Sequence, residues 1–181
     1  MSKPKFIQAK WYTKGPRPAP IGVIVLHTME SPEKPFTAEE VAAWFARGGG
    51  GKTSIHYCID NNSMVQCVKD KDIAWHSGHW PTNERSLSIE LAGRAEQTPS
   101  QWRDEYSIME LVRAAHLVAT WCNEYNIPIV RLTPKQLKAG KRGICGHTDV
   151  TIAFDVAGGH MDPRENFPWK MFLDMVKRVR L

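Results

Sequence analysis

The stretch Ile21-Gly22-Val23-Ile24-Val25-Leu26-His27 decides the fold. Its apolar run is typical of a strand that is buried on both faces in the middle of a sheet. Helices cover both sides of such a sheet, so the run predicts an α/β domain. His27 then lies where the strand leaves the sheet.

Further strands are expected on the C-terminal side of this run. Segments 54–60 and 64–68 would form a hairpin across the turn-forming cluster Asn61-Asn62-Ser63. Another strand is expected over 86–91, with Ser86, Ser88 and Glu90 on one face and Leu87, Ile89 and Leu91 on the other. Glu90 would therefore face away from the apolar side, toward a polar cleft or solvent.

Four helices are expected between and after these strands. The first begins at Thr37, as an N-cap with Glu40 three residues on, and ends at Arg47. The others are a long packing helix over 107–125, a short helix that starts at Thr133-Pro134, and a last helix from 169 to about 180. The order predicts one α/β domain, a central mixed β-sheet flanked by helices, over 21–181. Residues 1–20, which contain four prolines, would be an extended lead-in.

Composition sets the limits on function. The chain has 181 residues, 42% of them hydrophobic, which fits one globular domain with a proper core. A net charge of +5 fits an anionic partner, but the basic residues form no long run, so a nucleic acid is not expected. No apolar stretch has the length of a signal peptide or a membrane span, so synthesis in the cytoplasm without membrane insertion is expected. The chain is expected to be a monomer.

The four cysteines show no metal-binding spacing. Cys58, Cys67, Cys122 and Cys145 lie in apolar patterns, so buried thiols are the first expectation. A disulfide between Cys58 and Cys67, on what would be adjacent strands, is the alternative.

Three distant positions have the residue types of zinc ligands. They are His27, His147 in Cys145-Gly146-His147, and Asp162 in His160-Met161-Asp162-Pro163. Two imidazoles and a carboxylate leave the fourth position of tetrahedral zinc open, as in catalytic sites, which points to a hydrolase. His160 is a rival to Asp162 as third ligand, and Asp149 is expected to cap the turn after His147.

A set of short motifs, in order, resembles one enzyme family. Besides the strand ending in His27, these are Ser54-Ile55-His56-Tyr57-Cys58-Ile59-Asp60, Ala74-Trp75-His76-Ser77-Gly78, Asn83 with Ser86-Leu87-Ser88-Ile89-Glu90-Leu91, Gly146-His147, and Asp162-Pro163 through Asn166-Phe167-Pro168-Trp169. The set resembles the zinc N-acetylmuramoyl-L-alanine amidases of the type-2 class, which include phage endolysins and peptidoglycan recognition proteins. The resemblance covers roughly residues 21–175 and implies their α/β fold.

The resemblance implies a substrate and a set of roles. Family members cleave the amide between N-acetylmuramic acid and L-alanine of bacterial peptidoglycan, with one Zn²⁺ per chain that activates water. Here His27, His147 and Asp162 would hold the zinc, and Glu90 would be the general base. His76, Trp75, Asn83 and Trp80 would line the substrate groove, although His79 and Trp80 could equally be ordinary loop residues.

Three departures from the family pattern bear on mechanism. Ile55 stands where some members have a catalytic tyrosine, which favours Glu90 as the base. His160 stands where many members have a lysine that stabilises the oxyanion, and it is expected to do this work. The spacing from His147 to Asp162 is longer than in compact members.

The biological role is expected to be that of a phage endolysin, released to the cell wall when a holin opens the membrane. A non-catalytic peptidoglycan-binding module and a regulatory protein that binds a polymerase are the alternatives. The first would lack a zinc ligand, and the second would need a partner surface that the sequence does not show.

Overall fold

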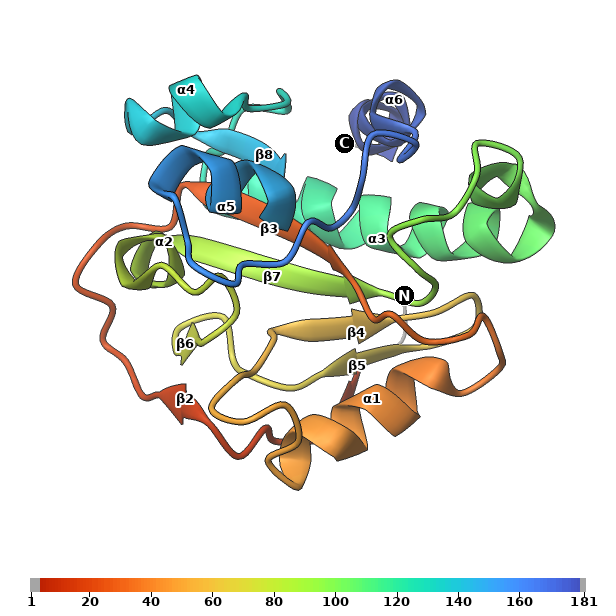
Figure 1. Ribbon diagram of the computed structural model, residues 1–181, viewed down its shortest axis with the longest axis horizontal. Helices are drawn as coiled ribbons and strands as arrows, with labels where there is room; N and C mark the ends of the chain where they lie inside the picture. The colour runs from red at the N-terminus through yellow and green to blue at the C-terminus, as the bar shows by residue number, and fades with distance from the viewer. Residues whose placement is uncertain (1–3, 180–181) are drawn as a thin grey trace.

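A six-stranded mixed sheet lies at the centre of the molecule (Figure 1). This computed structural model describes residues 4–179. The strand order is β1 (Lys5–Phe6), β5 (Met64–Gln66), β4 (Tyr57–Ile59), β7 (Ser86–Leu91), β3 (Val23–Thr28) and β8 (Gly143–Gly146). The last four strands are mutually parallel, and β5 runs antiparallel to β4. All of β3 is buried, which confirms the predicted central strand and α/β class.

The first face of the sheet carries the largest part of the core. The helices α3 (Glu105–Glu124) and α6 (Trp169–Val179) pack here, as Figure 1 shows. On β7 the side chains of Leu87, Ile89 and Leu91 enter this core. The predicted alternation of β7 is therefore correct, and Ser86, Ser88 and Glu90 project from the opposite face.

The second face carries two separate apolar clusters. Helix α1 (Thr37–Ala46) packs over β4 and β5 through Ala38, Ala42 and Phe45. Helices α4 (Pro134–Lys138) and α5 (His147–Phe154) pack over β3 and β8. Since β7 lies between β4 and β3, its Ser86, Ser88 and Glu90 form a polar stripe between the two clusters. This polar stripe is the floor of the site described below.

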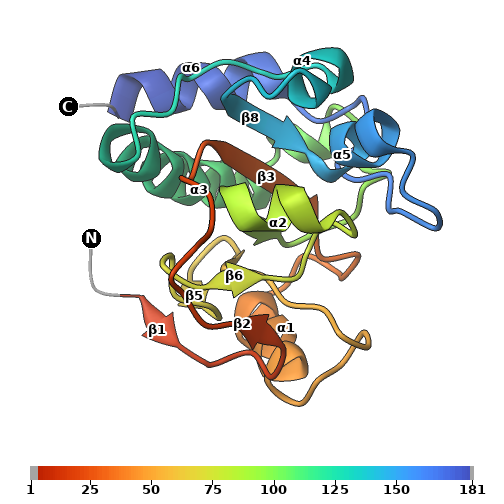
Figure 2. The same cartoon turned by 90° about the vertical axis from the view of Figure 1, so that its left-hand side faces the viewer.

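Short elements complete one side of the molecule, which Figure 2 shows facing the viewer. They are α2 (Trp80–Arg85) and a two-stranded sheet of β2 (Tyr12–Thr13) and β6 (Ile73–Ala74). The lead-in thus contributes β2 to this sheet and β1 to the main one. A division between lead-in and domain at residue 20 stays a prediction.

The start of α1 differs from the expectation. Thr37 is the first helical residue, not the N-cap, because Phe36 takes the cap position in a left-handed conformation. The amide of Ala38 instead donates to Asp60 Oδ2 on a distant turn, at 3.0 Å. A partner from another element has replaced the local capping box. At α4 the predicted Thr133 cap is correct, with a capping box to Gln136.

Other boundaries and elements also differ from the expectation. The two hairpin strands are shorter than predicted, and α2, α5, β6 and β8 were not expected. The end of the last helix at residue 180 lies outside the described residues.

All four cysteines are buried thiols, and the sulfurs of Cys58 and Cys67 lie 3.8 Å apart without a disulfide. In residues 4–179 no helix is long and apolar enough to cross a membrane.

A buried carboxyl on α3 makes the stability of the fold depend on pH. Glu110 is fully buried and accepts a hydrogen bond from the Ala92 amide, and its Oε2 has no hydrogen-bond partner within residues 4–179. Burial, helped by the carboxylates of Glu33 and Asp60, raises its pKa well above the usual value of 4.5. The folded protein therefore keeps a proton that the unfolded chain releases above about pH 4.5.

Glu110→Gln is expected to flatten this pH dependence. In the wild type the contribution of Glu110 to the free energy of unfolding falls by about 1.4 kcal/mol per pH unit, as the pH rises from about 4.5 toward the pKa of the folded carboxyl. Glutamine keeps the acceptor for Ala92 and cannot ionise. Urea unfolding at pH 5 and pH 8 should show a gain for the variant that is larger at pH 8. Glu105→Gln, at the exposed start of the same helix, is the control, and equal gains at both pH values would contradict the prediction.

Candidate metal centre

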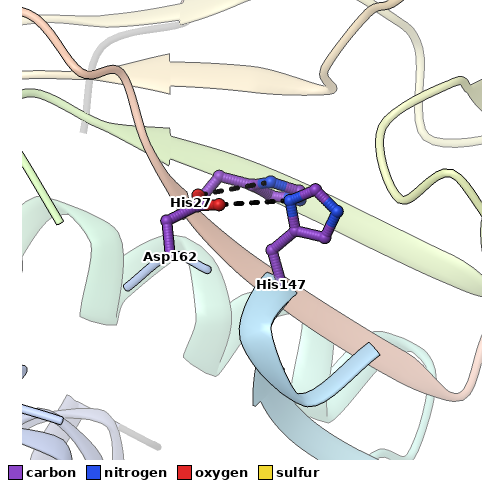
Figure 3. Close-up of side chains that lie close together, drawn as sticks. All are labelled: His27, His147 and Asp162. Atoms are coloured by element: carbon purple, nitrogen blue, oxygen red, sulfur yellow. Dashed lines mark ion pairs between the residues drawn. The ribbon is translucent and has the colours of Figure 1, made fainter. Parts of the chain in front are cut away.

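Three side chains from different parts of the chain meet above the end of β3 (Figure 3). His27 is the next-to-last residue of β3, His147 is the first residue of α5, and Asp162 lies in the segment between α5 and α6. All three are buried, and they offer ligand atoms within 4.8 Å of one another. The structure thus brings together the three residues expected to hold zinc.

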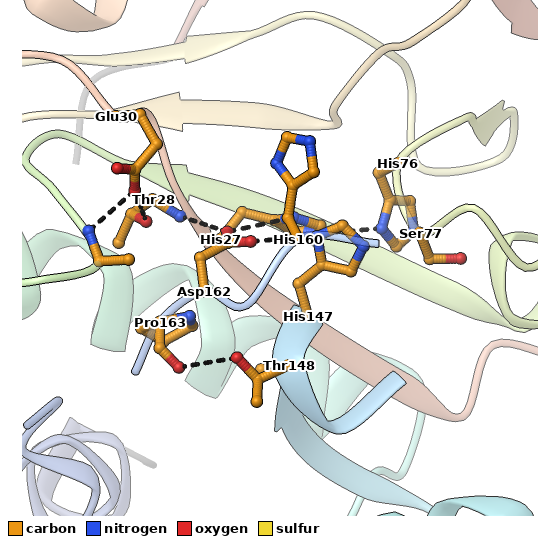
Figure 4. Close-up of polar contacts among 12 residues, drawn as sticks. His27, Thr28, Glu30, His76, Ser77, His147, Thr148, His160, Asp162 and Pro163 are labelled. Atoms are coloured by element: carbon orange, nitrogen blue, oxygen red, sulfur yellow. Dashed lines mark hydrogen bonds and ion pairs between the residues drawn. The ribbon is translucent and has the colours of Figure 1, made fainter. Parts of the chain in front are cut away.

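Backbone hydrogen bonds hold this arrangement in place (Figure 4). The amide of Thr28 donates to Asp162 Oδ2 at 2.9 Å, and the amide of Thr148 donates to the Asp162 carbonyl at 2.9 Å. The Asp149 carboxylate accepts from the Gly146 amide at 2.8 Å and so caps the start of α5, as expected from the sequence. Strand β3, helix α5 and the Asp162 segment are therefore locked to one another.

The donor atoms fit a metal ion. His27 Nδ1 lies 3.7 Å from Asp162 Oδ2, and His147 Nδ1 lies 3.2 Å from Asp162 Oδ1. Tetrahedral zinc with bonds of about 2.1 Å separates its ligand atoms by about 3.4 Å. Within residues 4–179, both nitrogens of His147 and Asp162 Oδ1 are buried without a hydrogen-bond partner. Buried lone pairs that converge in this way are costly unless a cation binds them.

The protonation of the group also suits a cation. Burial, helped by the nearby His147, holds the pKa of His27 well below its usual value, so the ring is neutral near pH 7. Burial alone would raise the pKa of Asp162, but the His147 and His27 rings and the Thr28 amide hold it below its usual value. Metal ligands must be neutral imidazole and ionised carboxylate, which these groups supply.

Glu90 lies beside this centre at the end of the polar stripe. Its Cα pairs with that of His27 across β7 and β3, and its buried Oε2 has no hydrogen-bond partner among the described residues. Burial, together with the charges of Asp162 and Glu30, raises its pKa well above the usual value. A carboxylate with a raised pKa is suited to take up a proton during a reaction.

A cleft of about 1100 Å³ opens over the centre. Its floor contains His27, His147, Asp162 and Glu90, and its walls come from α1 with the glycine-rich segment after it, and from 156–160. The volume is slightly above the usual range of about 300–1,000 Å³ for small-molecule sites.

His160 lies on the rim of the cleft and not among the three converging residues. Its ring is exposed, and its centroid lies 5.6 Å from that of His147. The geometry favours Asp162 over His160 as third ligand and leaves His160 free to reach a bound substrate.

The four residues expected to bind substrate all border the cleft but differ in their contacts. Trp80 is 44% exposed, and Trp75 lies between Trp11 and Trp80 with ring centroids 6.3 Å away on each side. His76 is 9% exposed, and both its ring nitrogens bind protein groups. Asn83 is also buried, and its Oδ1 accepts from the Ser77 backbone and hydroxyl. The two tryptophans therefore offer a surface to a ligand, whereas His76 and Asn83 face protein.

Two residues at the centre were missed from the sequence. Thr28 and Ser86 act through a backbone amide and a hydroxyl, and neither residue type signals a role by itself. Two signals were available: Thr28 directly follows His27, and Ser86 lies on the same face of its strand as Glu90.

Comparisons with known proteins agree with this fold and identify the family. Residues 17–165 match the family model described as N-acetylmuramoyl-L-alanine amidase. The 1,6-anhydro-N-acetylmuramyl-L-alanine amidase AmpD of Haemophilus influenzae is 26% identical over 192 residues, covering 94% of this chain and 91% of the relative. The hydrolase AmiA of Staphylococcus aureus has a TM-score of 0.70 at 16% identity, over 99% of this chain and 83% of AmiA. A selenomethionine derivative of AmpD has a TM-score of 0.68 at 17% identity, over 97% and 96%.

The fold and the site define an amidase that acts on peptidoglycan. The chain belongs to the N-acetylmuramoyl-L-alanine amidase family, in its type-2 class. The resemblance expected from the sequence is therefore confirmed.

Proposed function

We propose that this protein is a zinc-dependent amidase that hydrolyses the bond between N-acetylmuramic acid and L-alanine of the stem peptide. The observation that carries the proposal is the convergence of His27, His147 and Asp162 at the floor of a large cleft, beside Glu90, whose Oε2 has no hydrogen-bond partner among the described residues. When bound, zinc would polarise the amide carbonyl and lower the pKa of water in the site.

Glu90 is the general base in this proposal. Its free Oε2 takes a proton from the attacking water and returns it to the leaving amine of L-alanine. The sheet fixes its backbone next to that of His27, so the carboxylate keeps its position relative to the ligands throughout the reaction.

His160 is the group that stabilises the oxyanion. From the rim beside His147 it donates a hydrogen bond to the amide oxygen as negative charge develops there. Trp75 and Trp80 form one side of the cleft and pack against the sugar or peptide faces of the substrate.

Two biological roles follow from two kinds of relative. A phage endolysin, which reaches the cell wall after a holin opens the membrane, is the first, and a mutant endolysin from Bacillus subtilis shares the fold at a TM-score of 0.60. The second is hydrolysis of soluble 1,6-anhydro-muropeptides, because AmpD is named for that substrate.

Two substrates, given separately to the protein, test the amidase activity and the biological role. They are purified peptidoglycan and a 1,6-anhydro-muropeptide. New L-alanine amino termini should appear, stop on chelation and return with zinc. Faster release from intact peptidoglycan supports the endolysin role, and faster release from the soluble fragment supports the second role. If the zinc-loaded protein releases no L-alanine termini from either substrate, the proposed amidase activity is wrong.

A further inference from the structure

We infer that Ser86 and His76 form a hydrogen-bonded relay that fixes the tautomer of His27, so that its Nδ1 lone pair faces the metal site. The relay consists of three hydrogen bonds in series, and it starts at the carbonyl of Thr82 in α2. Ser86 Oγ lies 2.7 Å from this carbonyl, His76 Nε2 lies 2.9 Å from Ser86 Oγ, and His27 Nε2 lies 3.0 Å from His76 Nδ1. Figure 4 shows His76 beside His27.

The carbonyl at the start of the relay sets the direction of every bond. A carbonyl oxygen can only accept, so the single hydroxyl proton of Ser86 is donated to Thr82. The oxygen of Ser86 must then accept from His76, which places the N–H of His76 on Nε2. A neutral imidazole has one N–H, so Nδ1 of His76 is an acceptor.

The last bond transmits this choice to the ligand. Because His76 Nδ1 accepts, His27 must donate to it from Nε2, and the lone pair of His27 is left on Nδ1. This nitrogen is the one that lies 3.7 Å from Asp162 Oδ2. The opposite tautomer would place a proton between His27 and the cation. The hydrogen bond on one ring nitrogen of a histidine decides which state the other nitrogen offers to a metal.

The fold holds the relay rigidly. Ser86 is the first residue of β7 and is fully buried, and Thr82 is buried in α2 directly before it. Asn83 accepts from the Ser77 amide at 3.0 Å and from its hydroxyl at 2.7 Å, which fixes the turn that carries His76. His76 and Asn83 are thus positioning residues, which accounts for their burial at the edge of the cleft.

The strand offers a matched control. Ser88 is two residues farther along β7, on the same face and equally buried, but its hydroxyl binds His56 Nδ1 at 2.8 Å. His56 makes no hydrogen bond to any of the three expected ligands; its Nε2 is next to Arg17 and the Asp72 carbonyl. Ser86→Ala and Ser88→Ala therefore remove the same group from equivalent places, and only the first breaks the relay.

The inference rests on the proposed zinc site, and its test uses no substrate. In the zinc-free wild type, nitrogen-15 NMR of the histidine rings should show the proton of His27 on Nε2 and that of His76 on Nε2. In chelator competition, Ser86→Ala should weaken zinc binding about 10- to 100-fold. Ser88→Ala should change it less than 3-fold, and Ser86→Thr, which keeps the hydroxyl, should restore most of the affinity.

Several outcomes separate this inference from the proposed function. The relay is wrong if the wild type carries the proton of His27 on Nδ1. It is also wrong if Ser86→Ala and Ser88→Ala lose zinc affinity equally, even if the enzyme is an active zinc amidase. The expected tautomers and affinities in a protein that hydrolyses no peptidoglycan would support the relay and overturn only the function. If Ser86→Ala does not fold, the wild-type tautomers and the Ser86→Thr affinity decide.

Discussion

Replacing Glu90 with glutamine is expected to lower the turnover number by about 10²- to 10⁴-fold, the range for loss of a general base. Glutamine has nearly the same size as glutamate and still fits between the two apolar clusters, but it cannot take a proton from water. Glu90 is not one of the three converging residues, so the zinc content should remain that of the wild type. Steady-state rates on peptidoglycan, with metal analysis of the same samples, measure both quantities.

The control for this variant is Glu40→Gln. Glu40 borders the same cleft from α1 but is exposed and lies on the wall instead of the floor. Its rate should stay within about 3-fold of the wild type, as for most surface changes away from the reacting atoms. A Glu90→Gln enzyme with the same small loss would remove Glu90 from the mechanism and leave His160 as the next candidate for proton transfer.

Replacing Asp162 with asparagine is expected to weaken zinc binding by more than the roughly 100-fold upper range for outer partners of a ligand, because a ligand itself is changed. Asparagine can still accept from the Thr28 amide, so the local fold should survive. It lacks the negative charge that balances the cation between two neutral imidazoles. Competition with a chromogenic chelator measures the affinity, and activity should be recovered only at high zinc concentration.

Asp155→Asn is the matched control for this change. Asp155 is exposed at the end of α5, in a left-handed conformation that asparagine also tolerates. Its zinc affinity should equal that of the wild type. If Asp162→Asn also binds zinc normally while His160→Ala does not, then His160 is the third ligand and the sequence-based preference for Asp162 is wrong.

The sequence predicted the parts of the site that follow from strand ends and motif order. The apolar run before His27 identified the central strand, and the alternation from Ser86 to Leu91 placed Glu90 on the polar face. Asp162 was preferred to His160 because Asp162-Pro163 through Trp169 resembles the third-ligand segment of the amidase family, and the structure brings it to within 3.7 Å of His27 Nδ1. These features depend on local pattern and order, which sequence contains directly.

The relay could not be predicted, because it depends on side chains that meet only after folding. His27 precedes His76 by 49 positions and Ser86 follows it by ten, and His76 was expected to line the substrate groove instead. Helix α5 was missed for a different reason: its N-cap is Gly146, which has no side chain to mark a helix start, and only Val150 and Ala153 enter the buried apolar cluster. The cap of α1 was misassigned because Asp60 supplies it from another element.

The polar stripe lies between two apolar clusters, so the residues that carry out the reaction and those that recognise the substrate belong to different parts of the fold. The reacting groups stand on β3, on β7, at the start of α5 and in the segment that contains His160 and Asp162. The cleft walls at 47–53 and 156–159 lie in connections that pack little of the apolar core. Descendants of this chain can therefore acquire new substrates by exchanging wall sequences while the chemistry is inherited unchanged, and the same segments are the natural starting points for a designed change of target.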